Sequence, residues 1–473
     1  MQKAGKSAQN ASKELSGLRS ERQGILDEVE RIRSEHFHDC EKNYPDEDYW
    51  GNSNIELQKS SPWMSKKLQI FREQLFWSAV RLHKYFIILS RKPLSSNITA
   101  LKRLLVNNDL PSSQLLNVRS LWASLFLIVP VISSTFASVY RLFKHLKQEE
   151  IGWLMIDEAG QASPHHAVGA IWRSKRVIVV GDPLQLEPIV TLPKVLSCKL
   201  YRHHHVDPVY DVVLQSVQTL SDMSNPIGTF IGNNEEKIWV GAPLIVHRRC
   251  VGPMFSVSNQ IAYNGLMIQA TEPKLSAIEQ YFNHSLWISP QNEFANDLGS
   301  HWIEAEGRIA CYIIHVLIKK MNTLPSVYII TPFVSVKTAL IDYIKQQCLK
   351  EWKQFLPEAE AKSLYKKLYE MIGTVHTFQG KQADAVILLL GGNIRKRGAI
   401  AWASAKPNIL NVAVTRAKKL LYVIGSIKEW GDQPHFSELS ANMQVVCDRK
   451  SFKEKCLIKT QDIHANELAD MTH

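Results

Sequence analysis

Acidic side chains follow two apolar runs near the middle of the chain. The run 153–156 precedes Asp157 and Glu158, and the run 177–180 precedes Gly181, Asp182 and Gln185. An uncharged run bounded by turn residues predicts a buried strand of a parallel sheet, and such sheets bind ligands at the carboxyl ends of their strands. Adjacent carboxylates there suit Mg²⁺ and a base that orients water toward a nucleotide phosphate. The two segments predict a phosphate-hydrolysing site, although an acid pair after a strand also stabilises a helix N-terminus.

Composition and charge narrow the class of protein. The chain has 473 residues, 45% of them hydrophobic and 21% charged, which is enough for two or three globular domains. Its formal net charge of +11 favours a polyanionic partner such as nucleic acid. Seven scattered cysteines without a CxxC pair argue against a disulfide framework or a zinc module, and fit a reducing, cytoplasmic location. No signal-peptide pattern is present at the charged N-terminus.

One uncharged segment, 121–140, is long enough to span a bilayer. Pro130 lies in its middle, however, and serine and threonine residues crowd its second half. We therefore predict a buried strand at 125–129 followed by a polar loop, and no membrane partner.

The order of elements predicts an α/β protein with a helical N-terminal part. Residues 10–36 carry apolar side chains at heptad spacings, which indicates an amphipathic helix and one arm of a coiled coil. Residues 40–65 predict a linker, and a second helix is expected over 65–90. Beyond residue 120, strands and helices alternate, as in parallel sheets. The predicted strands are 125–129, 153–156, 177–180, 327–330, 386–390 and 421–424, and the predicted helices are 164–172, 302–319, 334–349 and 408–418. Loops and turn formers over 190–300 suggest a boundary near 240 between two α/β domains with a cleft between them.

Five segments between residues 120 and 430 form an ordered set. They are 157–161 (DEAGQ), 181–188 (GDPLQLEP), 247–250 (HRRC) followed by Pro253, 374–381 (TVHTFQGK) and 411–418 (NVAVTRAK). In this order they are similar to motifs II, III, IV, V and VI of superfamily 1 helicases. The chain resembles the branch that includes the nonsense-mediated-decay helicase and its bacterial relatives.

The resemblance implies a fold of two tandem RecA-like motor domains, the first of them incomplete. We expect a helical or coiled-coil arm over 1–115, a partial first motor domain over 116–240, a second motor domain over 241–440 and a tail over 441–473. The family's cofactors are ATP and Mg²⁺, and its partner is single-stranded DNA or RNA.

The resemblance also assigns roles to matching residues. Asp157 would hold Mg²⁺, Glu158 would be the base, Gln185 would sense the γ-phosphate, and Arg249 and Arg416 would be arginine fingers. Further nucleotide contacts would come from Gly181, Asp182, Glu304, Gln379 and Gly380. Nucleic-acid contacts would come from Ser134, Thr135, Thr331, Pro332, Thr374, His376 and Thr377.

Some of these assignments have plain structural alternatives. Arg248 lies next to Arg249, and Pro253 is one residue further along than the family's usual spacing. Glu304 is also an ordinary first-turn helix acid, and His376 and Phe378 would equally pack a strand end.

The sequence departs from the family at the phosphate-binding loop. A GxxxxGK[ST] turn should precede motif II, because its backbone amides and lysine bind the phosphates. The sequence contains Gly-Lys-Ser only at 5–7, where the required first glycine would fall before Met1 and a charged heptad follows. Gln382 is a second departure, since the family often has an acid there.

Two hypotheses are consistent with these observations. In the first, the chain is the carboxyl-terminal part of an ATP-driven helicase whose loop lies on an upstream fragment. In the second, it is a catalytically inactive, nucleic-acid-binding remnant. Retention of Asp157, Glu158, Gln185 and Arg416 favours the first.

Overall fold

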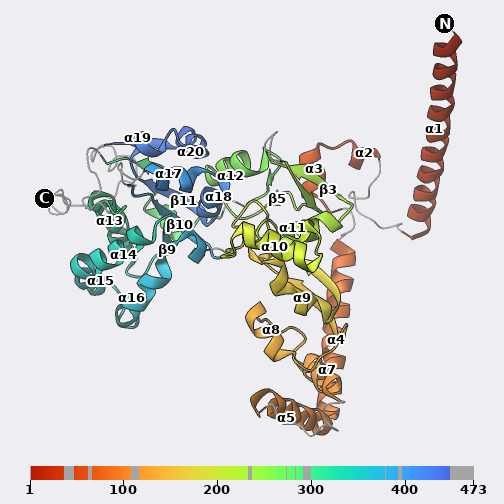
Figure 1. Ribbon diagram of the computed structural model, residues 1–473, viewed down its shortest axis with the longest axis horizontal. Helices are drawn as coiled ribbons and strands as arrows, with labels where there is room; N and C mark the ends of the chain where they lie inside the picture. The colour runs from red at the N-terminus through yellow and green to blue at the C-terminus, as the bar shows by residue number, and fades with distance from the viewer. Residues whose placement is uncertain are drawn as a thin grey trace. The chain divides into compact units, whose positions relative to one another are not determined.

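The computed structural model describes residues 2–36, 47–61, 66–107, 117–232, 237–272, 274–282, 284–290, 300–378, 380–392 and 397–447. The chain divides into two compact units, Met1–Leu94 and Ser95–His473. Figure 1 labels the elements along the chain. The mixture of helices with parallel strands confirms the predicted α/β class.

The first unit is helical, as predicted. Its helices are α1 (Gln2–His36), α2 (Glu47–Trp50), α3 (Asn54–Lys59) and α4 (Lys66–Leu89), and α5 (Arg91–Asn107) continues into the second unit. Two short helices, α2 and α3, occupy part of the segment expected to be a linker. Two leucines of the predicted heptad are exposed: Leu15 has 52% of its surface accessible, and Leu18 has 60%. The coiled-coil pairing of α1 therefore stays a prediction.

The prediction of a strand at 125–129 is wrong, because most of this segment belongs to a helix. Helix α7 covers Val118–Ile128. Its buried residues Val118, Leu121 and Trp122 recur at helical spacing, and Trp122 packs against Phe143 with ring centroids 4.8 Å apart. A loop and α8 (Phe136–Leu142) follow. In the described part of the chain, no helix is both long and apolar enough to cross a membrane.

The two acid-bearing segments follow a pair of parallel strands. Strand β1 (Ile151–Ile156) pairs with β2 (Ser174–Val179), and α9 (Pro164–Trp172) connects them. Both strands were predicted, but the residues that the structure describes cover only one face of them. Ile156 and its half-buried neighbours pack on Phe136, Ala167 and Val217, whereas Trp153 and Met155 are 56% and 71% exposed. Among the described residues, β1 and β2 pair only with each other.

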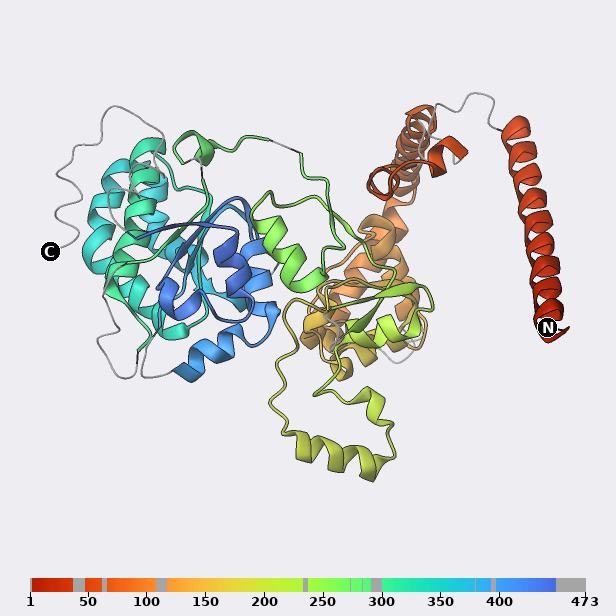
Figure 2. The same cartoon turned by 90° about the horizontal axis from the view of Figure 1, so that it is seen from above.

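A loop-rich stretch follows the second acidic segment. It carries α10 (Lys194–His204), α11 (Val217–Ser224) and the antiparallel hairpin β3 (Gly228–Ile231) with β4 (Ile238–Gly241). Figure 2 shows the yellow-green segment around α10 extending away from β1 and β2. A short parallel pair, β5 (Val246–His247) and β6 (Ile268–Gln269), lies on either side of α12 (Met254–Tyr263) in the sequence.

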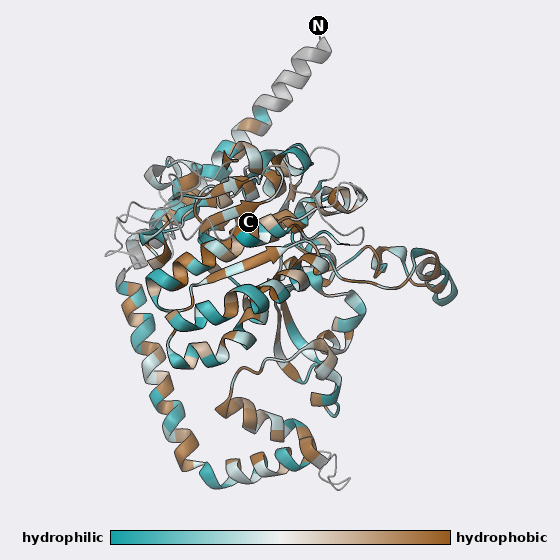
Figure 3. Cartoon of the chain, turned by 90° about the vertical axis from the view of Figure 1, so that its left-hand side faces the viewer, coloured by the Kyte–Doolittle hydropathy of each residue, from teal (hydrophilic) through white to brown (hydrophobic). Residues whose placement is uncertain are grey.

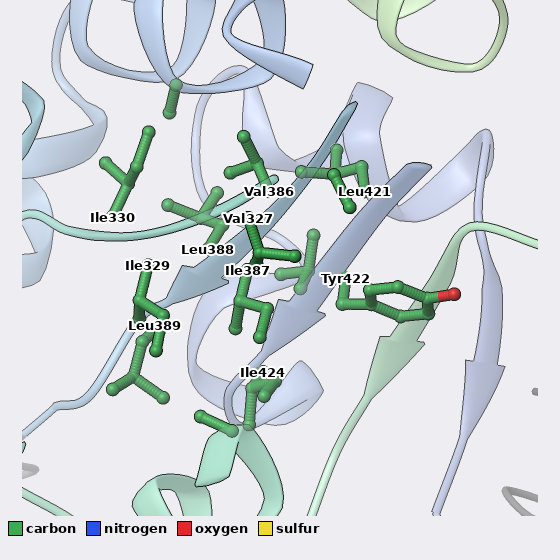
Figure 4. Packing of buried hydrophobic residues seen from close by; sticks show 14 of the residues in the cluster. Val327, Ile329, Ile330, Val386, Ile387, Leu388, Leu389, Leu421, Tyr422 and Ile424 are labelled. Atoms are coloured by element: carbon green, nitrogen blue, oxygen red, sulfur yellow. The ribbon is translucent and has the colours of Figure 1, made fainter. Parts of the chain in front are cut away.

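Six parallel strands form the central sheet of the second unit. Their spatial order is β12-β7-β11-β10-β8-β9. The strands are β7 (Leu286–Ile288), β8 (Val327–Thr331), β9 (Ile372–Thr374), β10 (Ala383–Leu389), β11 (Ala417–Ile424) and β12 (Gln444–Val446). Figure 4 shows the interlocking Val, Ile and Leu side chains of β8, β10 and β11. In Figure 3 the strands at the centre of this unit are brown, and the helices around them carry teal stretches. Such all-parallel sheets need cover on both faces, which explains why near-continuous apolar runs predicted their central strands.

Helices cover this sheet. They are α13 (Glu304–Met321), α14 (Val334–Tyr343), a π-helical turn (Ile344–Cys348), α15 (Leu349–Phe355), α16 (Glu358–Met371), α17 (Arg397–Ser404), α18 (Pro407–Thr415), α19 (Ile427–Trp430) and α20 (Phe436–Ala441). The helix predicted over 408–418 ends at Thr415, because β11 begins at Ala417. The six-stranded sheet with its helices has the RecA-like α/β form that we expected, whereas the first sheet is incomplete. The expected domain limits at 115, 240 and 440 stay predictions.

Candidate functional site

The first acidic turn begins where β1 ends. Asp157 is exposed, and its Oδ1 accepts a hydrogen bond of 2.9 Å from the backbone N–H of Glu158. Glu158 has a left-handed backbone with φ of 53°, which turns the chain sharply into a short 3₁₀ helix. Gln161 Nε2 donates to Glu158 Oε2 at 3.4 Å. The two carboxylates therefore project from a tight turn at a strand end, as the sequence predicted.

The second acidic turn lies directly against the first. A Cβ atom on Gly181 would lie 2.8 Å from the backbone nitrogen of Ala159, and one on Gly160 would lie 2.8 Å from the carbonyl oxygen of Asp182. Real Cβ atoms do not approach so closely, so both positions require glycine. The two glycines allow both turns to meet through their backbones.

Within the second turn, the side chain of Asp182 organises its neighbours. Its Oδ1 accepts from the backbone N–H of Leu184 at 2.9 Å, and its Oδ2 accepts from Gln185 Nε2 at 2.8 Å. Oδ2 also accepts a hydrogen bond from the hydroxyl of Tyr263, at the end of α12. In this structure Asp182 acts on the protein itself, by fixing the carboxamide of Gln185.

The buried guanidinium of Arg416 meets that carboxamide. Arg416 is only 1% exposed and follows α18 directly. Its Nη2 donates to Gln185 Oε1 at 3.3 Å, its Nη1 to the Lys381 carbonyl at 3.2 Å and its Nε to the Val412 carbonyl at 3.2 Å. Burial and then the neighbouring Arg249 lower the pKa of Arg416 to about 10, so it remains a cation at neutral pH. The segments 181–188 and 411–418 thus meet through a hydrogen bond from a charged group.

Arg249 borders a pocket beside this contact. The pocket has a volume of about 500 Å³ and is lined by Asp182, Gln185, Leu244, Val246, His247, Arg248, Arg249, Ser258, Tyr263, Met267, Gln382 and Thr415. Arg248 and Arg249 both line the pocket, and both residues are exposed. His247 Nε2 accepts from the backbone N–H of Cys250 at 3.0 Å, and burial followed by Arg249 lowers the pKa of His247 to about 4. His247 is therefore a neutral neighbour of two cations.

Gly380 lies next to the first acidic turn. A Cβ on Gly380 would lie 3.6 Å from Glu158 Oε1, and the φ of Gly380 is 74°, a conformation that favours glycine. Gln379 lies outside the described residues. The 3₁₀ helix Val375–Phe378 leads to this point from the carboxyl end of β9, while β10 starts at the opposite end of the sheet. The segment between β9 and β10 therefore connects the two ends of the sheet.

The expected nucleic-acid residues of the second domain lie at the far end of the sheet. Thr331 pairs with Thr374 where β8 and β9 end. Thr374 Oγ1 and Thr377 Oγ1 lie 3.3 Å apart, His376 is exposed, and Pro332 is half-buried. The structure therefore separates these residues from Arg416, at the amino end of β11. Phe378 is fully buried against Tyr328, so it packs the domain.

The expected residues of the first domain lie in the loop before α8. Ser134 and Thr135 are exposed, and Thr135 Oγ1 donates to Ser138 Oγ at 3.4 Å. Their hydroxyl groups thus sit at a helix start and on the molecular surface.

Glu304 does not join the site that surrounds Gln185. It is exposed in the first turn of α13, whereas Glu306 is 2% exposed and its Oε2 accepts from the backbone N–H of Gly391 at 2.8 Å. Sequence reasoning missed Glu306, although a second acid two residues into an otherwise apolar helix was a usable signal. It also missed Tyr263, Asn408 and Asn411. Asn408 Nδ2 donates to the carbonyl of Gln185.

The chain is similar to two family models and to several known proteins. Two models described as AAA domain match residues 111–192 and 244–428. The chain is 25% identical over 289 residues to ATP-dependent helicase upf1 of Schizosaccharomyces pombe, covering 58% of this chain and 26% of that protein. It is 24% identical to Regulator of nonsense transcripts 1 of Dictyostelium discoideum, covering 63% and 20%, and 22% identical to the DNA replication ATP-dependent helicase/nuclease DNA2 of Gallus gallus, covering 63% and 25%.

The fold, the meeting of the ordered segments and these similarities define a helicase-class protein. The chain belongs to the Upf1-like branch of superfamily 1 helicases. It spans about a quarter of the length of these relatives.

Proposed function

We propose that this chain is the carboxyl-terminal portion of an ATP-dependent helicase that moves along single-stranded DNA or RNA. The hydrogen bond from Arg416 to Gln185 is the observation that supports this best. It joins a strand-end amide to a buried cation from another part of the chain, and such a pair can respond to the charge on a phosphate between them.

The proposed roles follow the geometry of each group. Glu158 would accept the proton of the attacking water, and Gln185 would sense the terminal phosphate. Arg416 and Arg249 would stabilise the charge that develops on the phosphoryl group. Arg416 donates to protein acceptors in this structure, so it would have to exchange Gln185 for phosphate oxygen during the reaction.

The acidic turn suits Mg²⁺ delivered together with a nucleotide. Asp157 is an exposed carboxylate whose Oδ1 is oriented by a backbone N–H. No cluster of three or more His, Cys, Asp or Glu that could hold a metal occurs among the residues that the structure describes. A site with one or two carboxylates fits Mg²⁺, which keeps several waters and takes its other ligands from phosphates. When bound, the ion would neutralise phosphate charge.

A phosphate-binding loop would come from an upstream segment or fragment. The exposed Trp153 and Met155 support this, because strands of a parallel sheet are normally covered on both faces. An added β-strand and helix carrying GxxxxGK[ST] would cover that face and bring backbone amides to the two acidic turns.

Nucleic acid would bind at the carboxyl ends of β8 and β9, with Ser134 and Thr135 contributing from the first domain. Pro332, Thr374, His376 and Thr377 are the candidate contacts, whereas the predicted contact Thr331 is fully buried and its hydroxyl accepts from the backbone N–H of Phe333. The net charge of +11 supports a polyanionic partner, and binding through backbone charge would weaken with salt. The scattered cysteines favour action in the reducing cytoplasm.

The first test is the intact mass of the endogenous protein, captured through its second motor domain and compared with 53.9 kDa. A larger product that hydrolyses ATP when single-stranded nucleic acid is added, and loses this activity in Glu158→Gln, supports the proposal. Tyr281→Phe, far from the acidic turns in sequence and bonded to the Lys320 carbonyl, is the control. A product of this mass that binds nucleic acid without hydrolysing ATP would instead identify an inactive remnant.

A further inference from the structure

Tyr263 connects the second acidic turn to α18 through two hydrogen bonds. Its hydroxyl donates to Asp182 Oδ2 and accepts from Asn411 Nδ2, the latter at 3.0 Å. Burial and then the charge of Asp182 raise the pKa of Tyr263 well above its usual value. The hydroxyl therefore stays protonated and remains a donor to Asp182 at any physiological pH.

The side-chain amide of Asn411 is oriented to donate a hydrogen bond to Tyr263. Asn411 is fully buried, and its Oδ1 accepts from Ser258 Oγ at 2.7 Å. This contact directs Nδ2 to Tyr263 and to the Leu184 carbonyl, 3.1 Å away. Both hydrogens of the amide are thus used, one on the tyrosine and one on the acidic turn.

These contacts close a ring of hydrogen bonds. Asp182 binds Gln185, Gln185 binds Arg416, and Arg416 follows the same helix that carries Asn411. Asp182 Oδ2 accepts from both Tyr263 and Gln185. Without the tyrosine hydroxyl, Asp182 Oδ2 would keep only Gln185, and one hydrogen of the buried Asn411 amide would lose its acceptor, which is costly.

We propose that Tyr263 is a positioning residue that holds the Asp182–Gln185 turn against α18 and so keeps Gln185 in contact with Arg416. This deepens the proposed function and rests on it for the sensing role of Gln185, although the contacts themselves need no nucleotide. Tyr263 also lines the 500 Å³ pocket, so a ligand that enters beside Arg249 would meet the ring directly.

Hydrogen–deuterium exchange of the purified 473-residue chain tests the proposal without ATP. In Tyr263→Phe, backbone amides over 181–188 should exchange faster, on the order of tenfold, because one buried hydrogen bond to a charged group is lost. Amides in α12 and in the central sheet should keep their wild-type rates. Tyr281→Phe, which also removes one hydroxyl bonded within the protein, should leave 181–188 unchanged.

A double-mutant comparison separates positioning from packing. In an Asp182→Ala background, Tyr263→Phe should add little to exchange over 181–188, because the tyrosine then has no carboxylate to hold. Full additivity, unchanged exchange over 181–188, or a uniform increase across α12 and the sheet would overturn the proposal. If Tyr263→Phe does not fold, Ser258→Ala gives the same test, since it releases Asn411 and should raise exchange in the same segment alone. None of these results depends on nucleotide hydrolysis, so they are independent of the test of the proposed function.

Discussion

The guanidinium of Arg416 donates to the carboxamide oxygen of Gln185 across 3.3 Å, although 231 positions separate the two residues in the sequence. Arg416 is buried, and Gln185 is oriented by its own hydrogen bond to Asp182. An anion that competed for Arg416 would therefore remove one of the two side-chain contacts that hold Gln185.

Arg416→Lys should destabilise the chain, because a lysine cannot reproduce the fork of donors to Gln185, Lys381 and Val412. We expect a loss of about 2 kcal/mol in the free energy of unfolding, measured by urea denaturation. Lys406→Ala is the matched control, since Lys406 forms an exposed ion pair with Glu187 at 2.7 Å. Its loss should cost less than about 1 kcal/mol, and equal effects for the two variants would contradict the prediction.

Gly181→Ala should push the two acidic turns apart. The added methyl group would lie 2.8 Å from the Ala159 nitrogen, and overpacking of this kind costs about 1–3 kcal/mol. Gly152→Ala provides the comparison, because nothing lies within 4 Å of its Cβ position. Thermal unfolding of both variants measures the difference. A Gly181→Ala protein as stable as Gly152→Ala would show that the turns separate freely.

Glu306→Ala should lower the free energy of unfolding far more than Glu304→Ala does. Removing the buried Glu306 carboxylate leaves the Gly391 N–H without this acceptor, at a cost of about 2–3 kcal/mol. Glu304 is exposed, so its replacement should change the free energy of unfolding by less than about 0.5 kcal/mol. Chemical denaturation of the two variants side by side distinguishes a structural acid from a surface acid.

The depressed pKa of His247 predicts a loss of stability on acidification. Its pKa is about 4 in the folded chain, below the ordinary 6.5, so the folded state binds fewer protons than the unfolded state between these values. The contribution of His247 is complete above pH 6.5 and declines as the pH falls toward 4. In His247→Gln, the slope of stability against pH in this window should decrease by at most about 1.4 kcal/mol per pH unit. An unchanged slope would mean that His247 does not contribute.

The sequence was most informative where local pattern decides structure. Apolar runs ending in acids marked β1 and β2 correctly, because parallel strands and their carboxyl ends have a strong local signature. The same reasoning failed for 125–129, since a short apolar run does not distinguish a strand from a buried helix. The contacts of Trp122 with Phe143 decided that question, and they depend on tertiary structure.

The polar network around the site could not be predicted for a different reason. Tyr263 and Asn411 lie on the apolar helices α12 and α18, and only the packing of these two helices brings Tyr263 to Asp182 and Asn411 to Tyr263 and the Leu184 carbonyl. Burial on one face of β1 and β2 was likewise overestimated, because the composition of a strand does not state whether its neighbours are in the same chain.

The open face of β1 and β2 has a consequence for the protein's life in a cell. Exposed Trp153 and Met155 lie on a sheet that has only two strands within the described part of the chain, and unpaired sheet edges recruit other strands. A chain of this length synthesised by itself should be prone to aggregation and should bind chaperones. Its abundance would then depend on how quickly a covering segment reaches that face.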